Sequence, residues 1–239
     1  MRRFPWGAVA VLCAVTAACA PRGTGPGSQG LTPPRDIAEV LARQREGTRT
    51  LRATFRLKVR RDGREAMSTR GALVVARPDR LRLQLFSLGV MTVYDFTARG
   101  DRFRVRRPLD DETRIGRLGG VADADAGVAA ELRPILLGSS AAPSGVEERG
   151  DAAHVRFDEP EGRREVVISR RDGSFQSEAL RSAGGDLRVR ARYSDHRLVD
   201  GLALPFRIAV DYPERQVSLD IEIERYTRNQ PVEDGLFEF

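Results

Sequence analysis

The most constraining feature of this sequence is an alternation of apolar and polar residues that recurs along most of the chain. In the segment LRATFRLKV (residues 51–59), every odd-numbered residue is apolar and every even-numbered residue is polar. A β-strand with one buried face produces this period of two. The pattern returns at 81–85, 187–193, 206–210 and 217–223. The sequence therefore predicts a mainly β protein whose strands each bury one face.

Short turns that pair glycine with aspartate separate these segments. They read RRDGR (60–64), ARGDR (98–102), ERGDA (148–152) and RRDGS (170–174). Such turns join neighbouring antiparallel strands. We expect about eleven strands, because one of twelve candidate spans, most readily 112–116, is expected not to form. The spans are 51–60, 68–77, 81–87, 90–97, 102–107, 112–116, 152–158, 163–169, 174–181, 186–194, 203–211 and 216–226.

Two segments have helical rather than strand-like patterns. Asp36 and Glu39 are spaced as in a capping box, and Ile37, Val40 and Leu41 form one apolar stripe. The second helical segment spans 122–138. The predicted architecture is one strongly curved antiparallel sheet with two helical segments against it.

The N-terminus has the pattern of a bacterial secretory signal. Two arginines precede an apolar stretch that is too short to span a membrane. Residues 16–18 are small and directly precede Cys19, which resembles a lipobox. We therefore expect a signal peptide at 1–18 and acyl chains such as palmitate on Cys19. The alternative is an ordinary secretory cysteine.

The mature chain is expected to have two parts. Residues 19–35 hold Cys19 and a flexible tether that is rich in proline and glycine. Residues 36–239 form a single domain. By resemblance to the sorting rule of Gram-negative lipoproteins, Ala20 after the cysteine favours the outer membrane. We expect a lipid-anchored protein that faces the periplasm.

Composition argues against several classes of function. The 40 basic residues are spread along the chain among 34 acidic ones, as on solvated strand faces, so nucleic acid is not an expected partner. The chain has no motif for nucleophilic catalysis, phosphate binding or metal ligation. We expect neither an enzyme nor a metal or cofactor site.

The apolar face of such a sheet is larger than two short helices can cover. Either the sheet closes or an apolar cavity remains under the helices, and a fully packed core is the alternative. A cavity lined by aliphatic side chains suits an acyl chain. The candidate lining residues are Phe55, Leu57, Leu83, Leu85, Leu132, Ile135, Leu136, Ile208, Val210, Leu219 and Ile221.

Three segments together resemble the LolA/LolB superfamily of outer-membrane lipoprotein sorting, and the LolB receptors most. They are DRLRLQLFSLG (79–89), GDRFRVRRP (100–108) and LRPILLG (132–138). The resemblance implies an incomplete antiparallel β-barrel of about eleven strands that encloses short helices. It also implies binding of lipoprotein acyl chains, insertion of lipoproteins into the outer membrane, and a periplasmic LolA-like carrier as a partner.

The apolar sequence Ser87-Leu88-Gly89 lies at a predicted hairpin tip, where polar residues are usual. In LolB receptors an exposed leucine in this loop contacts membrane or incoming lipid. By resemblance that role falls on Leu88, with Val90 and Met91 beside it. Alternatively, Leu88 packs over the open end of the sheet.

Two other functions of the protein remain open: a glycolipid-binding envelope-assembly lipoprotein, or a structural interaction lipoprotein without a lipid site.

Overall fold

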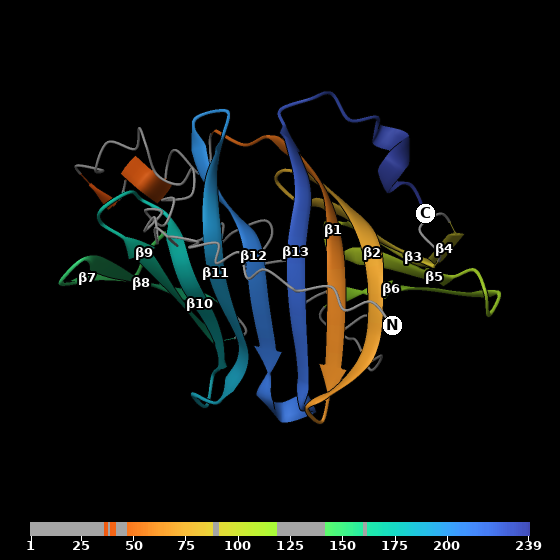
Figure 1. Ribbon diagram of the computed structural model, residues 1–239, viewed down its shortest axis with the longest axis horizontal. Helices are drawn as coiled ribbons and strands as arrows, with labels where there is room; N and C mark the ends of the chain where they lie inside the picture. The colour runs from red at the N-terminus through yellow and green to blue at the C-terminus, as the bar shows by residue number, and fades with distance from the viewer. Residues whose placement is uncertain (1–35, 38, 42–46, 88–90, 119–141, 160–161) are drawn as a thin grey trace, which may run out of the picture.

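One antiparallel sheet of thirteen strands makes up most of the described part of the protein. The structure is a computed structural model that describes residues 36–37, 39–41, 47–87, 91–118, 142–159 and 162–239 (Figure 1). The predicted signal peptide, the tether and the helical segment 122–138 therefore lie outside the described residues. So do six predicted site residues, namely Cys19, Leu88, Val90, Leu132, Ile135 and Leu136.

The strands follow one another with short turns, except where the chain passes from the sixth strand to the seventh. They are β1 (Thr50–Arg61), β2 (Arg64–Ala76), β3 (Arg80–Ser87), β4 (Met91–Arg99), β5 (Arg102–Arg107), β6 (Glu112–Arg117), β7 (Gly145–Arg149), β8 (Ala152–Glu159), β9 (Gly162–Ser169), β10 (Phe175–Ser182), β11 (Leu187–Val199), β12 (Leu202–Tyr212) and β13 (Val217–Arg228). Two short 3₁₀ helices follow β12 and β13, namely η2 (Pro213–Arg215) and η3 (Asp234–Phe237).

The order of strands across the sheet is β6-β5-β4-β3-β2-β1-β13-β12-β11-β10-β9-β8-β7. The chain therefore runs outward from β1 to the edge strand β6, starts again at the opposite edge with β7, and returns to the centre. There β13 pairs with β1. Figure 1 shows β3–β6 running across the direction of the central strands, so the sheet is strongly curved. Because β6 and β7 are both edges, the sheet stays open, and the prediction of an incomplete antiparallel barrel is confirmed.

The strand predictions differ from the structure at two places. All twelve candidate spans form strands. We expected that the span 112–116 would not form, but it forms β6, so this expectation was wrong. Strand β7 was not predicted. It has five residues, four of them exposed, and Val146 is its single large apolar residue. An edge strand of this kind has no buried face, and so the alternation that marks the other strands is absent.

Aspartate–glycine pairs form tight turns, as predicted for 60–64, whereas the pair at 200–201 was not among the predicted turns. Asp62 and Gly63 join β1 to β2 with φ angles of 53° and 75°. Asp200 and Gly201 join β11 to β12 with φ angles of 48° and 77°. Two successive positive φ angles define the turn whose twist matches antiparallel strands, and aspartate and glycine tolerate them best. These turns help to fix the register of their hairpins.

The two faces of the sheet differ sharply in chemistry. We call the face that carries Phe55 and Leu57 the apolar face, and the face that carries Arg56 and Lys58 the polar face. Side chains from β1–β5 and β11–β13 form one large buried cluster on the apolar face. In it the ring of Phe55 lies over Gly71, where an added Cβ would come within 2.3 Å of the ring. Glycine at this position lets the ring pack flat against β2.

A second, smaller cluster holds the N-terminal helical residues against β8 and β9. Ile37 and Val40 are buried, and Leu41 packs beside them. The amide of Val40 donates to the carbonyl of Asp36 over 3.3 Å, as in a helical turn. The predicted apolar stripe on this segment is confirmed.

The C-terminal residues cover part of the polar face, over β3 and β4. Phe237 in η3 is buried, and the guanidinium of Arg80 lies 5.2 Å from the centre of its ring. Arg82 binds the buried Asp95 through two hydrogen bonds of 3.0 and 2.7 Å and also donates to the carbonyl of Leu236. This segment therefore shields one salt bridge from water.

Arg228, at the end of β13, ties three separate parts of the chain together. Its guanidinium donates to the carbonyls of Val199 and Asp200 over 2.9 Å each, and to that of Gly47 over 2.6 Å. It also donates to the hydroxyl of the buried Thr48. Arg228 is itself buried, and its hydrogen bonds join the turn between β11 and β12 to the residues before β1.

We expect Arg228→Ala to lower the free energy of unfolding by on the order of 3 kcal/mol, because several buried acceptors lose their donor. Chemical denaturation followed by circular dichroism measures this. Arg225→Ala is the matched control, since Arg225 is exposed on the same strand. Equal losses in the two variants would contradict the assigned role of Arg228.

Candidate functional site

The eight predicted cavity residues that the structure describes all lie on the apolar face, in the large cluster. They come in pairs from four strands: Phe55 and Leu57 from β1, Leu83 and Leu85 from β3, Ile208 and Val210 from β12, and Leu219 and Ile221 from β13. The strands β3 and β12 are far apart in sequence and come together through the pairing of β1 with β13. The structure thus brings these eight residues onto one surface.

One transverse row shows how far the apolar face extends. Successive partners across nine strands, from β2 to β7, occupy a single line of register: Met67, Val59, Leu219, Val210, Ala191, Glu178, Val166, Val155 and Val146. Eight of the nine are apolar. Val210 in the middle is fully buried, whereas Met67 and Val146 at the two ends are 38% and 51% exposed. The apolar face is therefore continuous, and it is accessible to solvent at its margins.

Further apolar side chains of this face are only partly buried. Leu83 and Ile221, from the candidate set, are among them. The others include Leu51, Val59, Tyr94, Leu180, Val217 and Tyr226. A partly buried hydrocarbon surface of this kind gains stability when another apolar group covers it.

The apolar face also holds a buried polar group that the sequence predictions missed. Arg164 on β9 and Glu178 on β10 are 4% and 3% exposed, and Nε of Arg164 lies 2.6 Å from Oε1 of Glu178. The hydroxyl of Tyr193 donates to Oε2 of Glu178 over 3.1 Å. The guanidinium of Arg164 lies 5.5 Å from the centre of the Phe157 ring. We call Arg164, Glu178 and Tyr193 the buried triad.

The electrostatics of the buried triad favour a stable ion pair. Burial by itself lowers the pKa of Arg164, but the charge of Glu178 and its hydrogen bond outweigh this effect and raise the pKa. Burial, together with the charge of Glu178, raises the pKa of Tyr193 well above its usual value. Tyr193 therefore keeps its proton and remains a hydrogen-bond donor. A signal was present in the sequence, since the alternation in β9 places Arg164 on the same face as Val166 and Ile168.

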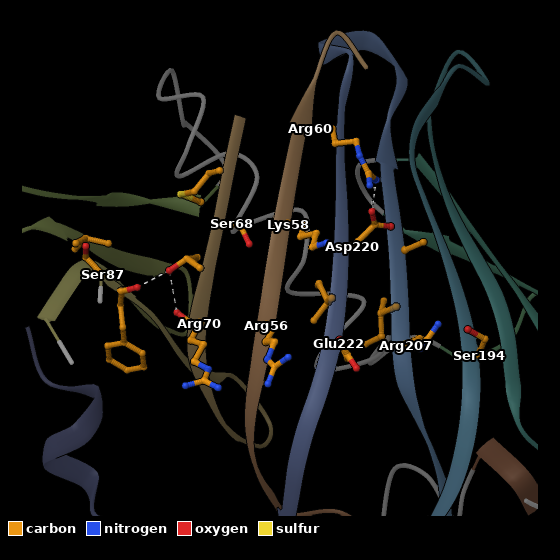
Figure 2. Close-up of a pocket in the computed structure, with 17 residues that line it drawn as sticks. Arg56, Lys58, Arg60, Ser68, Arg70, Ser87, Ser194, Arg207, Asp220 and Glu222 are labelled. Carbon is orange, nitrogen blue, oxygen red and sulfur yellow. Dashed lines mark hydrogen bonds and ion pairs between the residues drawn. The ribbon is translucent and has the colours of Figure 1, made fainter. Parts of the chain in front are cut away.

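A groove of about 960 Å³ crosses the polar face (Figure 2). Figure 2 shows Arg56, Lys58, Arg207 and Glu222 side by side on adjoining strands. The lining residues come from β1–β4 and β11–β13: Arg56, Lys58, Arg60, Met67, Ser68, Thr69, Arg70, Phe86, Ser87, Val93, Ser194, Arg207, Ile208, Ala209, Asp220, Ile221 and Glu222. The sequence analysis treated these arginines as solvated strand faces and did not predict that they converge.

Three of the five cations in the groove have an acidic partner. Arg56 and Arg70 both approach Glu224, at 2.8 and 3.4 Å, and Arg60 pairs with Asp220. Within the described part of the chain, no carboxylate lies at ion-pair distance from Lys58 or Arg207, and both side chains are exposed. The groove therefore has an excess of positive charge.

The predicted transfer tip is only partly described. Met91 begins β4 opposite Ser87 and is 45% exposed. Leu88 and Val90 lie outside the described residues, so the role of the tip stays a prediction.

Across the ranges that the structure describes, no three histidine, cysteine, aspartate or glutamate residues gather as metal ligands would. No helix within those ranges has the length and apolarity needed to cross a membrane.

No protein-family model matches this sequence, and no curated protein matches it. Solved structures do. A LolA superfamily protein from Nitrosomonas europaea is 12% identical and has a TM-score of 0.64 over 85% of this chain and 96% of that one. The chain has a LolA-like fold. This finding agrees with the superfamily that the sequence resembles.

Two further structures share this fold. A DUF1329 family protein from Desulfovibrio piger is 11% identical, with a TM-score of 0.63 over 86% of this chain and 97% of that one. A domain from Vibrio parahaemolyticus, named for outer membrane lipoprotein sorting, is 11% identical, with a TM-score of 0.58 over 84% and 94%. The LolA-like sheet is thus matched over nearly its whole length in three bacterial proteins.

We expect Glu178→Gln to lower the free energy of unfolding by about 3–5 kcal/mol, because it leaves the charge of Arg164 buried without a partner. Replacing both partners, as in Arg164→Met with Glu178→Leu, should recover most of this loss. Thermal unfolding measures both effects.

Glu165→Gln is the control for this prediction. Glu165 follows Arg164 on β9, but its side chain is 39% exposed and its pair with Arg181 is 3.6 Å long. Its loss should cost no more than about 1 kcal/mol. If the double variant proves less stable than Glu178→Gln, the triad does not act as an isolated buried ion pair.

Proposed function

We propose that this protein binds acyl chains of lipoproteins on its apolar face and helps to insert them into the outer membrane. The observation that carries the proposal is the continuous apolar row across nine strands, which is accessible at both ends. An open LolA-like sheet offers more apolar surface than its own described residues cover. Binding of this kind needs no covalent step and no cofactor, so we propose a binding protein rather than an enzyme.

The driving force is the transfer of hydrocarbon out of water. Each buried methylene group contributes about 0.8 kcal/mol, so a long acyl chain gains several kcal/mol even when it contacts only one wall. The partly buried side chains, such as Leu83 and Ile221, are the surface on which such contacts form. The buried triad adds a cluster of polar groups to this surface. An ester or amide group of a lipoprotein could approach this cluster.

The proposed location is the periplasmic side of the outer membrane. A lipobox-like sequence before Cys19 supports lipid attachment, and the LolA-like fold of this domain supports a place in the cell envelope. Three acyl chains would hold the protein on a bilayer far more firmly than one, which gives only marginal binding. The tether after Cys19 would reach roughly 20–24 Å, which lets the domain stand just off the membrane.

Hand-over to the bilayer would occur at the tip between β3 and β4. We propose that Leu88, Val90 and Met91 contact the membrane there. The exposure of Met91 supports this position for the tip. Burying one leucine contributes about 1.5–3 kcal/mol, which is small beside the lipid anchor but enough to orient a tethered domain.

We expect Leu83→Gln to weaken binding of a fluorescent fatty acid about fivefold, because the polar side chain replaces hydrocarbon on the apolar face. Fluorescence titration of the chain carrying Cys19→Ala, which removes the proposed attachment site, measures the affinity. Ile115→Gln is the matched control, since Ile115 is 56% exposed on the polar face of β6. Absence of saturable uptake by the unmodified domain would overturn the proposed function.

We expect Leu88→Glu to leave the circular dichroism spectrum and the unfolding midpoint unchanged but to reduce delivery of cargo lipoproteins to the outer membrane. A charged side chain resists entry into the acyl region, whereas Leu88→Met should retain activity. Membrane fractionation of a labelled cargo lipoprotein measures the delivery. Normal delivery by the Leu88→Glu variant would disprove the assignment of the tip.

A further inference from the structure

One line of register runs through the groove on the polar face. Six successive partners from β3 to β11 are Phe86, Arg70, Arg56, Glu222, Arg207 and Ser194. Directly opposite partners on neighbouring strands have Cβ atoms about 4.5–5.5 Å apart, so these side chains form a continuous strip. The side chains of this strip lie on the face opposite the proposed acyl-chain surface. The groove also contacts Ile208 and Ile221, which belong to the apolar face.

Two cations in this groove are available to a ligand. The acidic residues Glu224 and Asp220 lie against Arg56, Arg70 and Arg60. Lys58 and Arg207 are exposed, and no described carboxylate lies at ion-pair distance from either. The groove lining holds five cations against two carboxylates, Asp220 and Glu222, and this excess of positive charge favours an anionic ligand.

Each of these two cations is paired in register with a serine. Lys58 lies between Ser68 and Asp220 in the register, and Arg207 lies between Ser194 and Glu222. Ammonium, guanidinium and hydroxyl groups are the donors that bind phosphate oxygens. The centre of the groove thus offers phosphate-binding chemistry at two places on neighbouring parts of the sheet.

One end of the groove is apolar. Phe86 and Val93 line it at the β3–β4 hairpin, close to Met91, which is 45% exposed. A soluble phosphate would use only the cationic centre. A phospholipid has both a phosphate and hydrocarbon chains, and so it matches both parts of the groove.

We infer that this groove binds the headgroup of an anionic phospholipid in the membrane, with Lys58 and Arg207 at the phosphate and the apolar end toward the acyl region. The contact would turn the polar face toward the bilayer. It would leave the apolar face free for the acyl chains of a cargo lipoprotein. This site goes beyond the proposed function, and either one can fail without the other.

Lys58 allows a direct test because it is the only lysine in the chain. The full chain carrying Cys19→Ala is treated with an amine-acetylating reagent, and mass spectrometry follows the modification of Lys58. Phosphatidylglycerol vesicles should slow this reaction about fivefold, whereas phosphatidylcholine vesicles should leave the rate unchanged. An unchanged rate on phosphatidylglycerol vesicles that do bind the protein would overturn the inference.

A charge-reversed variant gives a second measurement. Lys58→Glu with Arg207→Glu should weaken partitioning onto phosphatidylglycerol vesicles by on the order of thirtyfold. The control, Arg106→Glu with Arg156→Glu, changes the net charge equally at exposed positions on β5 and β8, outside the groove. Its partitioning should fall only about twofold, through the weaker long-range attraction.

The remaining outcomes separate the possible explanations. Equal losses in the two double variants would mean general charge attraction and would overturn the inference. Protection of Lys58 by glycerol phosphate as strong as that by vesicles would mean a soluble phosphate ligand and would also overturn it. Fatty-acid uptake on the apolar face should be the same in both double variants, so a loss there would concern the proposed function instead.

Discussion

The pairing of β1 with β13 is the contact on which the rest of this structure depends. Strands β1–β6 form one meander and β7–β13 form another, and within the described residues this ladder is the one that joins them. It aligns eleven residue pairs, from Leu51 with Arg228 to Arg61 with Val217. Contacts so distant in sequence are slow to form, because the loop between them must close first. Arg228 reinforces the same junction by joining the start of β1 to the turn after β11.

The register of this central ladder decides the chemistry of both faces. A shift of one residue would move every apolar side chain of β1 to the opposite face. In the register observed, Leu57 aligns with Ile221 on one face, and Arg56 aligns with Glu222 on the other. The same ladder therefore completes the apolar surface and the cationic groove. One sheet can present two unlike surfaces because neighbouring residues of a strand point in opposite directions.

The sequence predicted much of the fold, whereas the role of the predicted site residues stays a prediction. Alternation and turn residues located twelve strands, and the eight described cavity candidates do gather on one face. Strand β7 was missed, because an exposed edge strand has no pattern to detect. The buried triad was also missed. Arg164 and Glu178 are charged residues, and burying either one in the protein interior is tolerated only when the two form an ion pair. The convergence of Arg56, Lys58 and Arg207 was missed because they come from strands about 150 residues apart in the sequence.

The sequence by itself determined which residues could be buried, since a period of two assigns each side chain to one side of its strand. It also determined where the tight turns lie, because aspartate and glycine tolerate the positive φ angles found there. Only the tertiary structure decided which strands became neighbours, and hence which side chains share a surface. Pairing between distant strands is set by the packing of the whole sheet, so it cannot be predicted from any local segment of the sequence. For that reason the residues of the apolar face could be predicted from the sequence. The buried triad and the polar-face groove could be identified only from the assembled sheet.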